Sequence, residues 1–250
     1  MTLSAGQAQL DSTSPVIGGS SHRVRDWNLF ADPDPVRNDQ LRTDIGTWPG
    51  ADRDGARMLW IETDCRGANA AAIVTARDAL LAAWRRSSTE QQLRFSEDGS
   101  TEFIYIGRTN GAAARSGPYF PTRCEFVATD PRRFSGAETT RTLGTHTSAT
   151  NAGTVETIWR WEIAGPVTNP TLSIGDFDLT YVGTVSSGQT LIASRRLGYI
   201  IKSGTGANGS VYGACVDQDG KLPVLPDLES GATTIGGTSG GSFIFRSAWQ

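Results

Sequence analysis

The sequence predicts a mainly β protein with two domains: an α+β domain over residues 1–147 and an antiparallel β-sandwich over 148–250. Three observations predict this class. A single convincing helical period covers residues 69–86, and the second half holds six or seven short alternating runs separated by glycine-rich turns. Between 132 and 154 the composition shifts to Ser, Thr, Gly and Arg, and we place the domain boundary there.

Length and charge narrow the function classes. A chain of 250 residues can bury a good core, at a size where one domain often becomes two. Its net charge of -3, with no basic block, argues against nucleic acid as the main partner. No apolar run approaches the length of a membrane span, and the N-terminus lacks a secretory signal pattern. We therefore expect a soluble protein that is made in a cytoplasm.

The three cysteines, Cys65, Cys124 and Cys215, lie far apart and form no C-x-x-C pair. An odd number suits no closed set of disulfides. Cys124 alternates with Phe126, so we expect it to be a small buried hydrophobic residue.

The first 60 residues have little apolar periodicity. Short β runs at 15–17, 23–29 and 57–63 are separated by stretches rich in Asp and Pro. Segments of this length without a core are uncommon inside compact domains. We therefore expect an extended N-terminal arm that orders against another subunit, and hence an oligomer.

The predicted helix packs into the core through one face. Asn69 can accept a hydrogen bond from the first turn and so cap the helix. Ile73, Leu80, Leu81 and Trp84 fall on one side at 3.6-residue spacing.

Strands of the first domain follow the helix. Alternation predicts strands around Leu93–Phe95 and Cys124–Ala128, and a continuous apolar strand at 103–106. Asp98-Gly99 and Asn110-Gly111 both predict turns.

The second domain begins with an alternation in which Trp159, Trp161 and Ile163 face one way. The closing run places Phe243 and Phe245 on one face, followed by Arg246 and Trp249. An ending that apolar is expected to be paired inside a sheet and buried. The other predicted strands are 172–174, 177–182, 190–193, 199–202, 211–216 and 242–246.

Several motifs superficially suggest chemistry. Residues 237–241 match G-x-S-x-G, but a strand is expected after Ser239, and His22 and His146 both precede it, so a glycine loop is favoured over a nucleophile elbow. Residues 204–209 match G-x-G-x-x-G without a following helix, which predicts a hairpin loop.

Asp217–Gly220 begins like a calcium loop but lacks the later acidic ligands, so a turn is favoured. The two histidines have no ligand partners at zinc spacing, and the carboxylates are scattered. We predict no catalytic residue, no metal site and no cofactor.

Three further segments form recognisable motifs: E-F-V-A-T-D-P-R-R at 125–133, N-A-G-T at 151–154 followed by P-V-T-N-P at 166–170, and F-I-F-R-S-A-W at 243–249. Together they resemble one family, the distal tail proteins of siphophages. One departure is that a Gly-x-x-L-x-Ile-Asp stretch of the family ends here in Ala193. The residues that carry the resemblance are Asp130, Pro131, Arg132, Asn151, Gly153, Phe243, Phe245, Arg246 and Trp249.

The resemblance implies a structural role. Members form a ring, expected here to be hexameric, at the distal end of the tail. The N-terminal domain builds the ring with an arm around its neighbour, and a galectin-like sandwich projects outward. The partners implied are copies of the chain itself, the tail tube and the baseplate or host-recognition proteins. The implied location is the virion tail tip.

Three alternative functions make different predictions. A carbohydrate-binding module would need exposed aromatic rings, so exposure of Trp159 and Trp161 would favour it. A tube or minor tail subunit is a second alternative. A secreted hydrolase lacks both a signal and catalytic residues.

Overall fold

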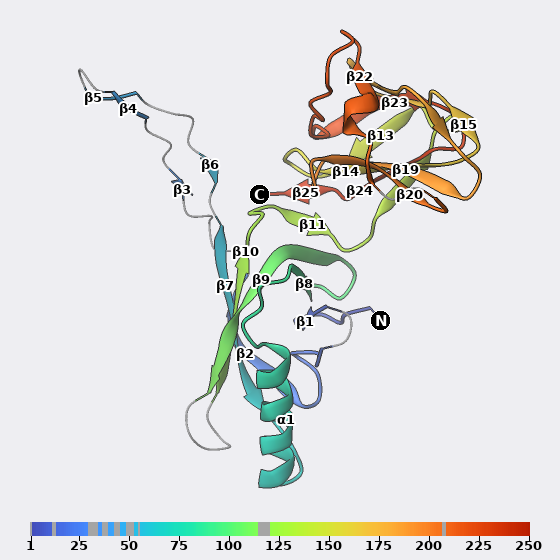
Figure 1. Cartoon of the computed structure of the whole chain (residues 1–250). Helices are drawn as coiled ribbons and strands as arrows, with labels where there is room; N and C mark the ends of the chain where they lie inside the picture. Colours follow the sequence, from blue (N-terminus) through green and yellow to red (C-terminus); the bar gives the residue numbers. More distant parts are fainter. Residues whose placement is uncertain are drawn as a thin grey trace. The chain divides into compact units, whose positions relative to one another are not determined.

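The computed structural model divides into two units, Met1–Gly136 and Ala137–Gln250 (Figure 1). This division precedes the predicted boundary at 147/148. The reason is that strand β12 (Thr139–Thr142) pairs with β24 (Ser242–Phe245) and so belongs to the second unit. The residues described are 2–11, 14–29, 35–36, 40–42, 46–48, 53–54, 56–114, 121–206 and 209–250.

The first unit contains an antiparallel sheet, and the predicted mainly β class is confirmed. The strands have the order β1-β8-β9-β10-β7-β2, and β11 also pairs with β9. Their bounds are β1 Gln7–Leu10, β2 His22–Asn28, β7 Arg57–Cys65, β8 Gln91–Ser96, β9 Glu102–Ala114, β10 Thr122–Ala128 and β11 Arg133–Ser135.

Helix α1 (Ala70–Ala83) packs against β7 and β9 (Figure 1). Its cap is as predicted, because the Asn69 side chain accepts from the Ala72 N–H at 2.9 Å. The helix ends earlier than the predicted residue 86. After Trp84 the backbone turns to β9 instead, where the Arg85 carbonyl accepts from the Thr109 hydroxyl.

The expectation of an N-terminal arm without a core of its own is wrong for residues 2–29. Leu3, Leu10, Ile17 and Leu29 are all fully buried, and β1 pairs with β8. Apolar side chains from this stretch complete the core beneath the sheet, although they follow no regular period. Ile17 makes only an isolated bridge to the first strand, so the predicted strand at 15–17 is absent.

Between β2 and β7 lie four short strands that form two separate two-stranded pairs. β3 pairs with β6, and β4 pairs with β5. Among the described residues, neither pair joins a larger sheet. The bounds are β3 Pro35–Val36, β4 Gln40–Arg42, β5 Gly46–Trp48 and β6 Arg53–Asp54.

The two predicted turns have different outcomes. Asp98-Gly99 connects β8 to β9, and the Asp98 carboxylate accepts from the Ser100 and Thr101 N–H groups. These bonds and the Ser100 hydroxyl lower the pKa of Asp98 to about 2. The turn predicted at Asn110-Gly111 is wrong. Both residues lie inside β9, where the register against β10 shifts and creates a bulge.

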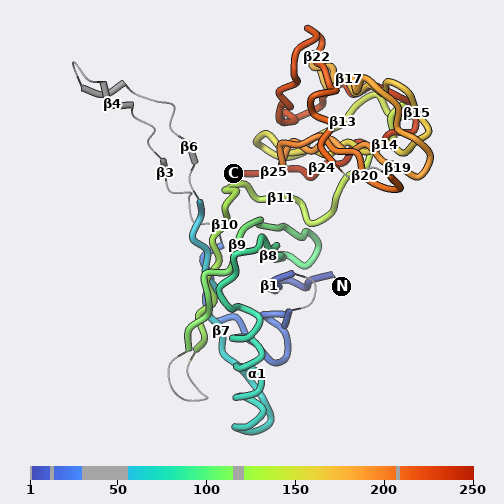
Figure 2. The backbone as a smooth tube through the Cα atoms, in the orientation of Figure 1, coloured from blue at the N-terminus to red at the C-terminus, as the bar shows by residue number. Residues whose placement is uncertain are grey.

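The second unit is an antiparallel sandwich of two sheets. Figures 1 and 2 show the five-stranded sheet, ordered β13-β23-β16-β17-β22, stacked on the six-stranded sheet, ordered β12-β24-β14-β19-β20-β21. The remaining bounds are β13 Ser148–Asn151, β14 Trp159–Ala164, β15 Val167–Thr168, β16 Thr171–Ile174, β17 Phe177–Tyr181, β18 Thr184–Val185, β19 Gln189–Ser194, β20 Tyr199–Gly204, β21 Gly209–Ser210, β22 Cys215–Asp217, β23 Gly231–Gly237 and β25 Ala248–Trp249.

Alternation correctly predicts the core of the sandwich. Trp159, Trp161 and Ile163 are buried in the cluster between the sheets, and Phe243 lies 5.5 Å from Trp159, centroid to centroid. The strand predicted at 211–216 is partly wrong, because Tyr212–Ala214 forms a short 3-10 helix. No helix in the described part of the chain is long and apolar enough to cross a membrane.

Candidate functional site

Asn151 joins two segments that the sequence presents as separate motifs. Its side-chain oxygen accepts from the Gly153 N–H at 3.1 Å and from the Ala248 N–H at 3.2 Å. Its side-chain nitrogen donates to the carbonyls of Val155 and Glu229. The residue is only 1% exposed, so one buried amide fastens the closing segment to the start of the sandwich. We call this arrangement the Asn151 latch.

Gly153 belongs to the same latch for a steric reason. A Cβ atom at this position would lie 1.7 Å from the Ala248 carbonyl oxygen, which is backbone and cannot rotate away. Beside it, the Ala152 N–H donates to the Ser247 hydroxyl at 3.0 Å. The N-A-G-T segment therefore needs a glycine so that the two backbones can meet.

The closing strand lies inside a sheet, as predicted. β24 pairs with β12 on one side and with β14 on the other. Phe243 and Phe245 are buried, and their centroids are 5.8 Å apart. Trp249 is half-buried. The strand is thus an interior strand of the six-stranded sheet and joins β12 to β14.

Arg246 faces charged side chains. It lies 3.7 Å from Glu138, which also lies 3.8 Å from Arg160. Arg160 in turn pairs with Glu162 at 2.6 Å. Most of these side chains are more than a third exposed, so the row contributes little to stability.

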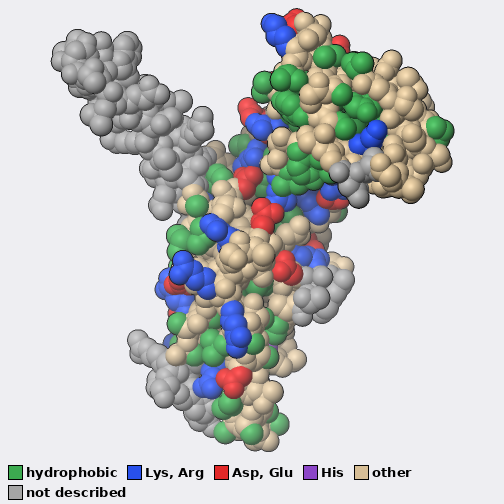
Figure 3. Space-filling model, in the orientation of Figure 1, with side chains coloured by type: hydrophobic (Ala, Val, Ile, Leu, Met, Phe, Trp, Pro, Cys, Tyr) green, Lys and Arg blue, Asp and Glu red, His purple; other side chains and the backbone are tan. Residues whose placement is uncertain are grey.

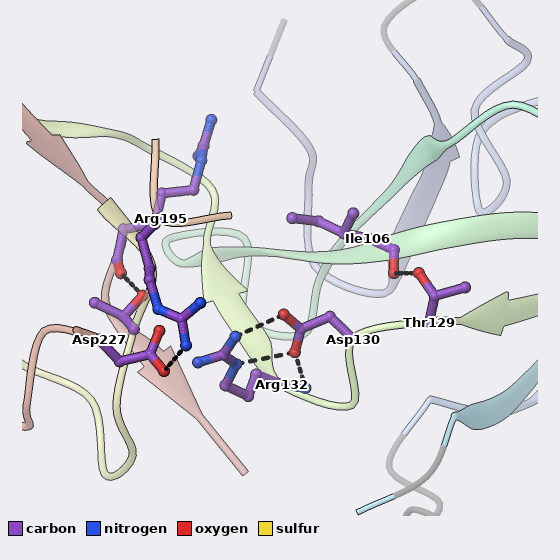
Figure 4. A network of polar contacts seen from close by, with 8 residues as sticks. Ile106, Thr129, Asp130, Arg132, Arg195 and Asp227 are labelled. Atoms are coloured by element: carbon purple, nitrogen blue, oxygen red, sulfur yellow. Dashed lines mark hydrogen bonds and ion pairs between the residues drawn. The ribbon is translucent and has the colours of Figure 1, made fainter. Parts of the chain in front are cut away.

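Asp130, Pro131 and Arg132 form a closed corner after β10 (Figure 4). The Arg132 guanidinium donates to both carboxylate oxygens of Asp130, at 2.9 and 2.8 Å. The Thr129 N–H donates to the Ile106 carbonyl at 3.1 Å. The strand that follows the corner, β11, pairs with β9, so both ends are tied to β9, and a two-point ion pair gives the corner a fixed shape.

The predicted helix face is buried unevenly. Leu80 and Trp84 are completely buried, whereas Ile73 and Leu81 are half-buried. The Trp84 indole nitrogen has no hydrogen-bond partner in the described structure. Trp84 therefore contributes to stability through the packing of its ring.

The sheet of the first unit has two unlike edges. At one end, β1 is covered by its own chain, since Ala8 exchanges backbone hydrogen bonds with Ile17. At the other end, no described strand pairs with the outer side of β2. This strand carries a bulge at Arg25, whose guanidinium lies 3.9 Å from Glu62. Bulges and charges are common on exposed edges.

The cysteines are not reactive groups. All three are free, and burial raises the pKa of each thiol, to about 11 for Cys215. Cys124 is completely buried, which confirms its predicted role as a small hydrophobic residue. Thiolates are the nucleophilic form, so these side chains are inert near neutral pH.

The histidines and Ser239 form no catalytic pair in the described structure. His22 lies 3.0 Å from the Ala76 carbonyl, and His146 contacts the backbone of Thr142 at 3.2 Å. Ser239 lies in the loop between β23 and β24, with a strand after it as predicted. The described residues contain no group of three or more potential metal ligands.

Two other motifs adopt the predicted loops. β20 and β21 pair antiparallel, Lys202 opposite Gly209, as predicted for a hairpin, although residues 207 and 208 of the motif lie outside the described residues. At Asp217 the backbone carbonyl accepts from the Gly220 N–H at 3.0 Å, closing a turn.

Trp159 and Trp161 are 2% and 0% exposed. Neither offers a ring on which a sugar could stack, so the observation that would have favoured a carbohydrate-binding module is missing.

In comparison with known structures, the fold of this chain is similar to the folds of phage hub and baseplate proteins. The chain is similar to the Dit protein of phage SPP1, described as a paradigm of the hub adsorption apparatus in phages that infect Gram-positive bacteria. The TM-score is 0.67 at 14% identity, over 98% of this chain and 99% of that one. Chains of the activated phage P2 baseplate, with Ca or Sr, match with TM-scores of 0.55 and 0.54 at 7% and 8% identity, over 96% of this chain and 97% of theirs. No protein-family model and no curated protein matches the sequence.

Proposed function

We propose that this chain is a structural, non-enzymatic subunit of the tail tip of a long-tailed phage. One observation carries the proposal: the match to SPP1 Dit extends over 98% of this chain and 99% of the other, so both units occur in the same order along one chain. The N-A-G-T and F-I-F-R-S-A-W motifs support it, because the Asn151 latch gives them a shared structural task.

We infer that the first unit forms a ring of six copies. Two features of this unit support self-association. The outer edge of β2 has no described partner, and the two-stranded pairs β3–β6 and β4–β5 join no larger sheet in the described structure. An isolated two-stranded ribbon is marginally stable in water, and free edges tend to pair with another chain. A neighbouring copy would supply the missing partner for both.

The ring would join the tail tube to the baseplate or host-recognition proteins. The second unit has its own core and its own closing latch, which suits a module that is carried by the ring. Such a role needs no cofactor and places the protein in the virion.

Native mass spectrometry of the purified full-length protein tests the ring. We expect a hexameric mass, and a chain whose segment 35–54 is replaced by a short Gly-Ser linker should be monomeric with both units still folded. A wild-type protein that stays monomeric at high concentration would refute the ring.

Antibody labelling of phage particles in electron micrographs tests the location. Label confined to the distal end of the tail is expected. Label along the whole tube would identify a different tail subunit, and absence from particles would refute the virion role.

A further inference from the structure

The loop between β22 and β23 presents large apolar side chains to solvent. Leu222 is 59% exposed and Val224 is 83% exposed, the highest value among the large hydrophobic residues of the described structure. Figure 3 shows hydrophobic side chains gathered among polar ones on the surface of the second unit. Groups of exposed apolar side chains rimmed by polar residues often mark interaction sites.

The loop is held rigidly from its inner side. The Tyr212 hydroxyl donates to the Pro223 carbonyl, and the Trp159 indole donates to the Pro226 carbonyl at 2.7 Å. Leu225 and Leu228 are buried in the sandwich core. The exposed side chains are thus presented by an anchored segment, so little conformational entropy is lost when a partner binds.

Further anchors hold both ends of the loop. The Asp217 and Lys221 backbones are hydrogen-bonded at 2.9 Å, from N–H to carbonyl. At the other end, Arg195 pairs with Asp227 at 3.1 Å (Figure 4). The side chains of Lys221 and Asp219 lie 3.6 Å apart. The charges of Lys221 and Asp227 beside the loop are therefore paired within the unit.

Most backbone N–H and C=O groups of residues 222–225 also make no hydrogen bond in the described structure. Leu222 and Val224 point outward while Pro223 and Leu225 point inward, which is the alternation of an extended strand. In the described structure, the N–H and C=O groups of Leu222, Val224 and Leu225 make no hydrogen bond. An extended, anchored segment with open backbone groups can accept an additional strand.

We propose that residues 222–225 form a docking segment for a short, extended, apolar peptide of a partner protein. The peptide adds beside the segment as a strand and covers Leu222 and Val224 with its own apolar side chains. A second copy of this chain does not fit as the occupant. Two exposed side chains fall far below the roughly 800 Å² per partner that a stable protein interface buries. This inference does not depend on the tail-tip role.

Selection of peptides from a displayed random library on immobilised full-length protein tests the proposal. Each selected peptide is then titrated against the wild type, against Leu222→Ser with Val224→Ser, and against the matched control Leu197→Ser with Val182→Ser. The control residues are each 57% exposed, so both pairs of residues are exposed to solvent and the main difference is their position on the surface. We expect peptides with alternating apolar residues, an affinity loss of about tenfold or more in the first variant, and none in the control.

Hydrogen exchange gives a second readout. The amides of Leu222 and Val224 should exchange more slowly when such a peptide is bound. The proposal is overturned if no peptide is enriched, if the docking variant binds as well as the wild type, or if both variants lose affinity equally. A lower oligomeric mass of the docking variant without any peptide would overturn it in favour of contact between copies.

Discussion

The two units complete their sheets in different ways. In the second unit, the closing strand β24 lies between β12 and β14, and the Asn151 latch fastens the segment that follows it. In the first unit, as far as the structure describes it, β2 ends the sheet without an outer partner, and the two-stranded pairs β3–β6 and β4–β5 join no larger sheet. In the described structure both units contain open sheets, but the closing strand of the second unit is paired on both sides, whereas β2 of the first unit is paired on one side only.

Removing the closing strand should have the largest effect. A chain that ends at Ser242 loses Phe243 and Phe245, each stabilising by about 1.5–3 kcal/mol, together with hydrogen bonds to two neighbouring strands. A domain's whole margin is about 5–15 kcal/mol. Limited proteolysis with mass spectrometry should show the second unit digested and the first unit resistant.

The control for this truncation is a chain that ends at Trp249 and lacks only the exposed Gln250. It should behave as wild type. A protease-resistant second unit in the shorter chain would show that the two units do not differ in the way described.

Trp84→Ala should lower the stability of the first unit by about 3–5 kcal/mol, the usual range for a buried aromatic side chain. Urea unfolding followed by fluorescence should show that only one of two transitions moves. The half-buried Ile73 is the control, and Ile73→Ala should cost about 1–2 kcal/mol. A loss under about 1 kcal/mol for Trp84 would mean that this helix face contributes little to the core.

Asn151→Ala should lower the stability of the second unit by about 2–3 kcal/mol. The change leaves several buried backbone groups without a partner, among them the Ala248 N–H. Thr150, the exposed neighbour in β13, is the control, and its change to Ala should cost about 0.5 kcal/mol or less. Equal effects of the two changes would show that the latch does not hold the closing segment.

Ser239→Ala should have the smallest effect, within about 0.5 kcal/mol on either unit. In the described structure the Ser239 hydroxyl makes no hydrogen bond to a basic side chain, so esterase activity should be absent before and after the change. An activity that disappears in the variant would contradict the non-enzymatic proposal.

Sequence patterns predicted those parts of the fold that rest on local alternation. β14 was predictable because Trp159, Trp161 and Ile163 alternate with polar residues. β23 was not, because Gly231–Gly237 is rich in glycine and threonine and buries only Ile235. The core role of residues 2–29 was hidden for a related reason: Leu3, Ile17 and Leu29 are buried without any period.

The latch could be recognised from sequence only as two motifs. Asn151 and Ala248 are 97 residues apart, and no local pattern links them. The exposed segment at 222–225 was also not singled out. Its two prolines, Pro223 and Pro226, were a sequence signal for an extended segment, but which side chains point outward depends on the anchors beneath it.

The position of β24 also sets an order for biosynthesis. Strands β1, β2 and β7 to β11 have all been made once residue 136 is reached, so the first unit can fold while translation continues. The sandwich cannot complete its six-stranded sheet until residues 242–245 have been made, because these residues form the strand between β12 and β14. During translation, the free edge of β2 can therefore form while the second unit is still unfinished. A chain whose synthesis stops early would have an incomplete, protease-sensitive sandwich. The cell could then degrade that chain before it enters a particle.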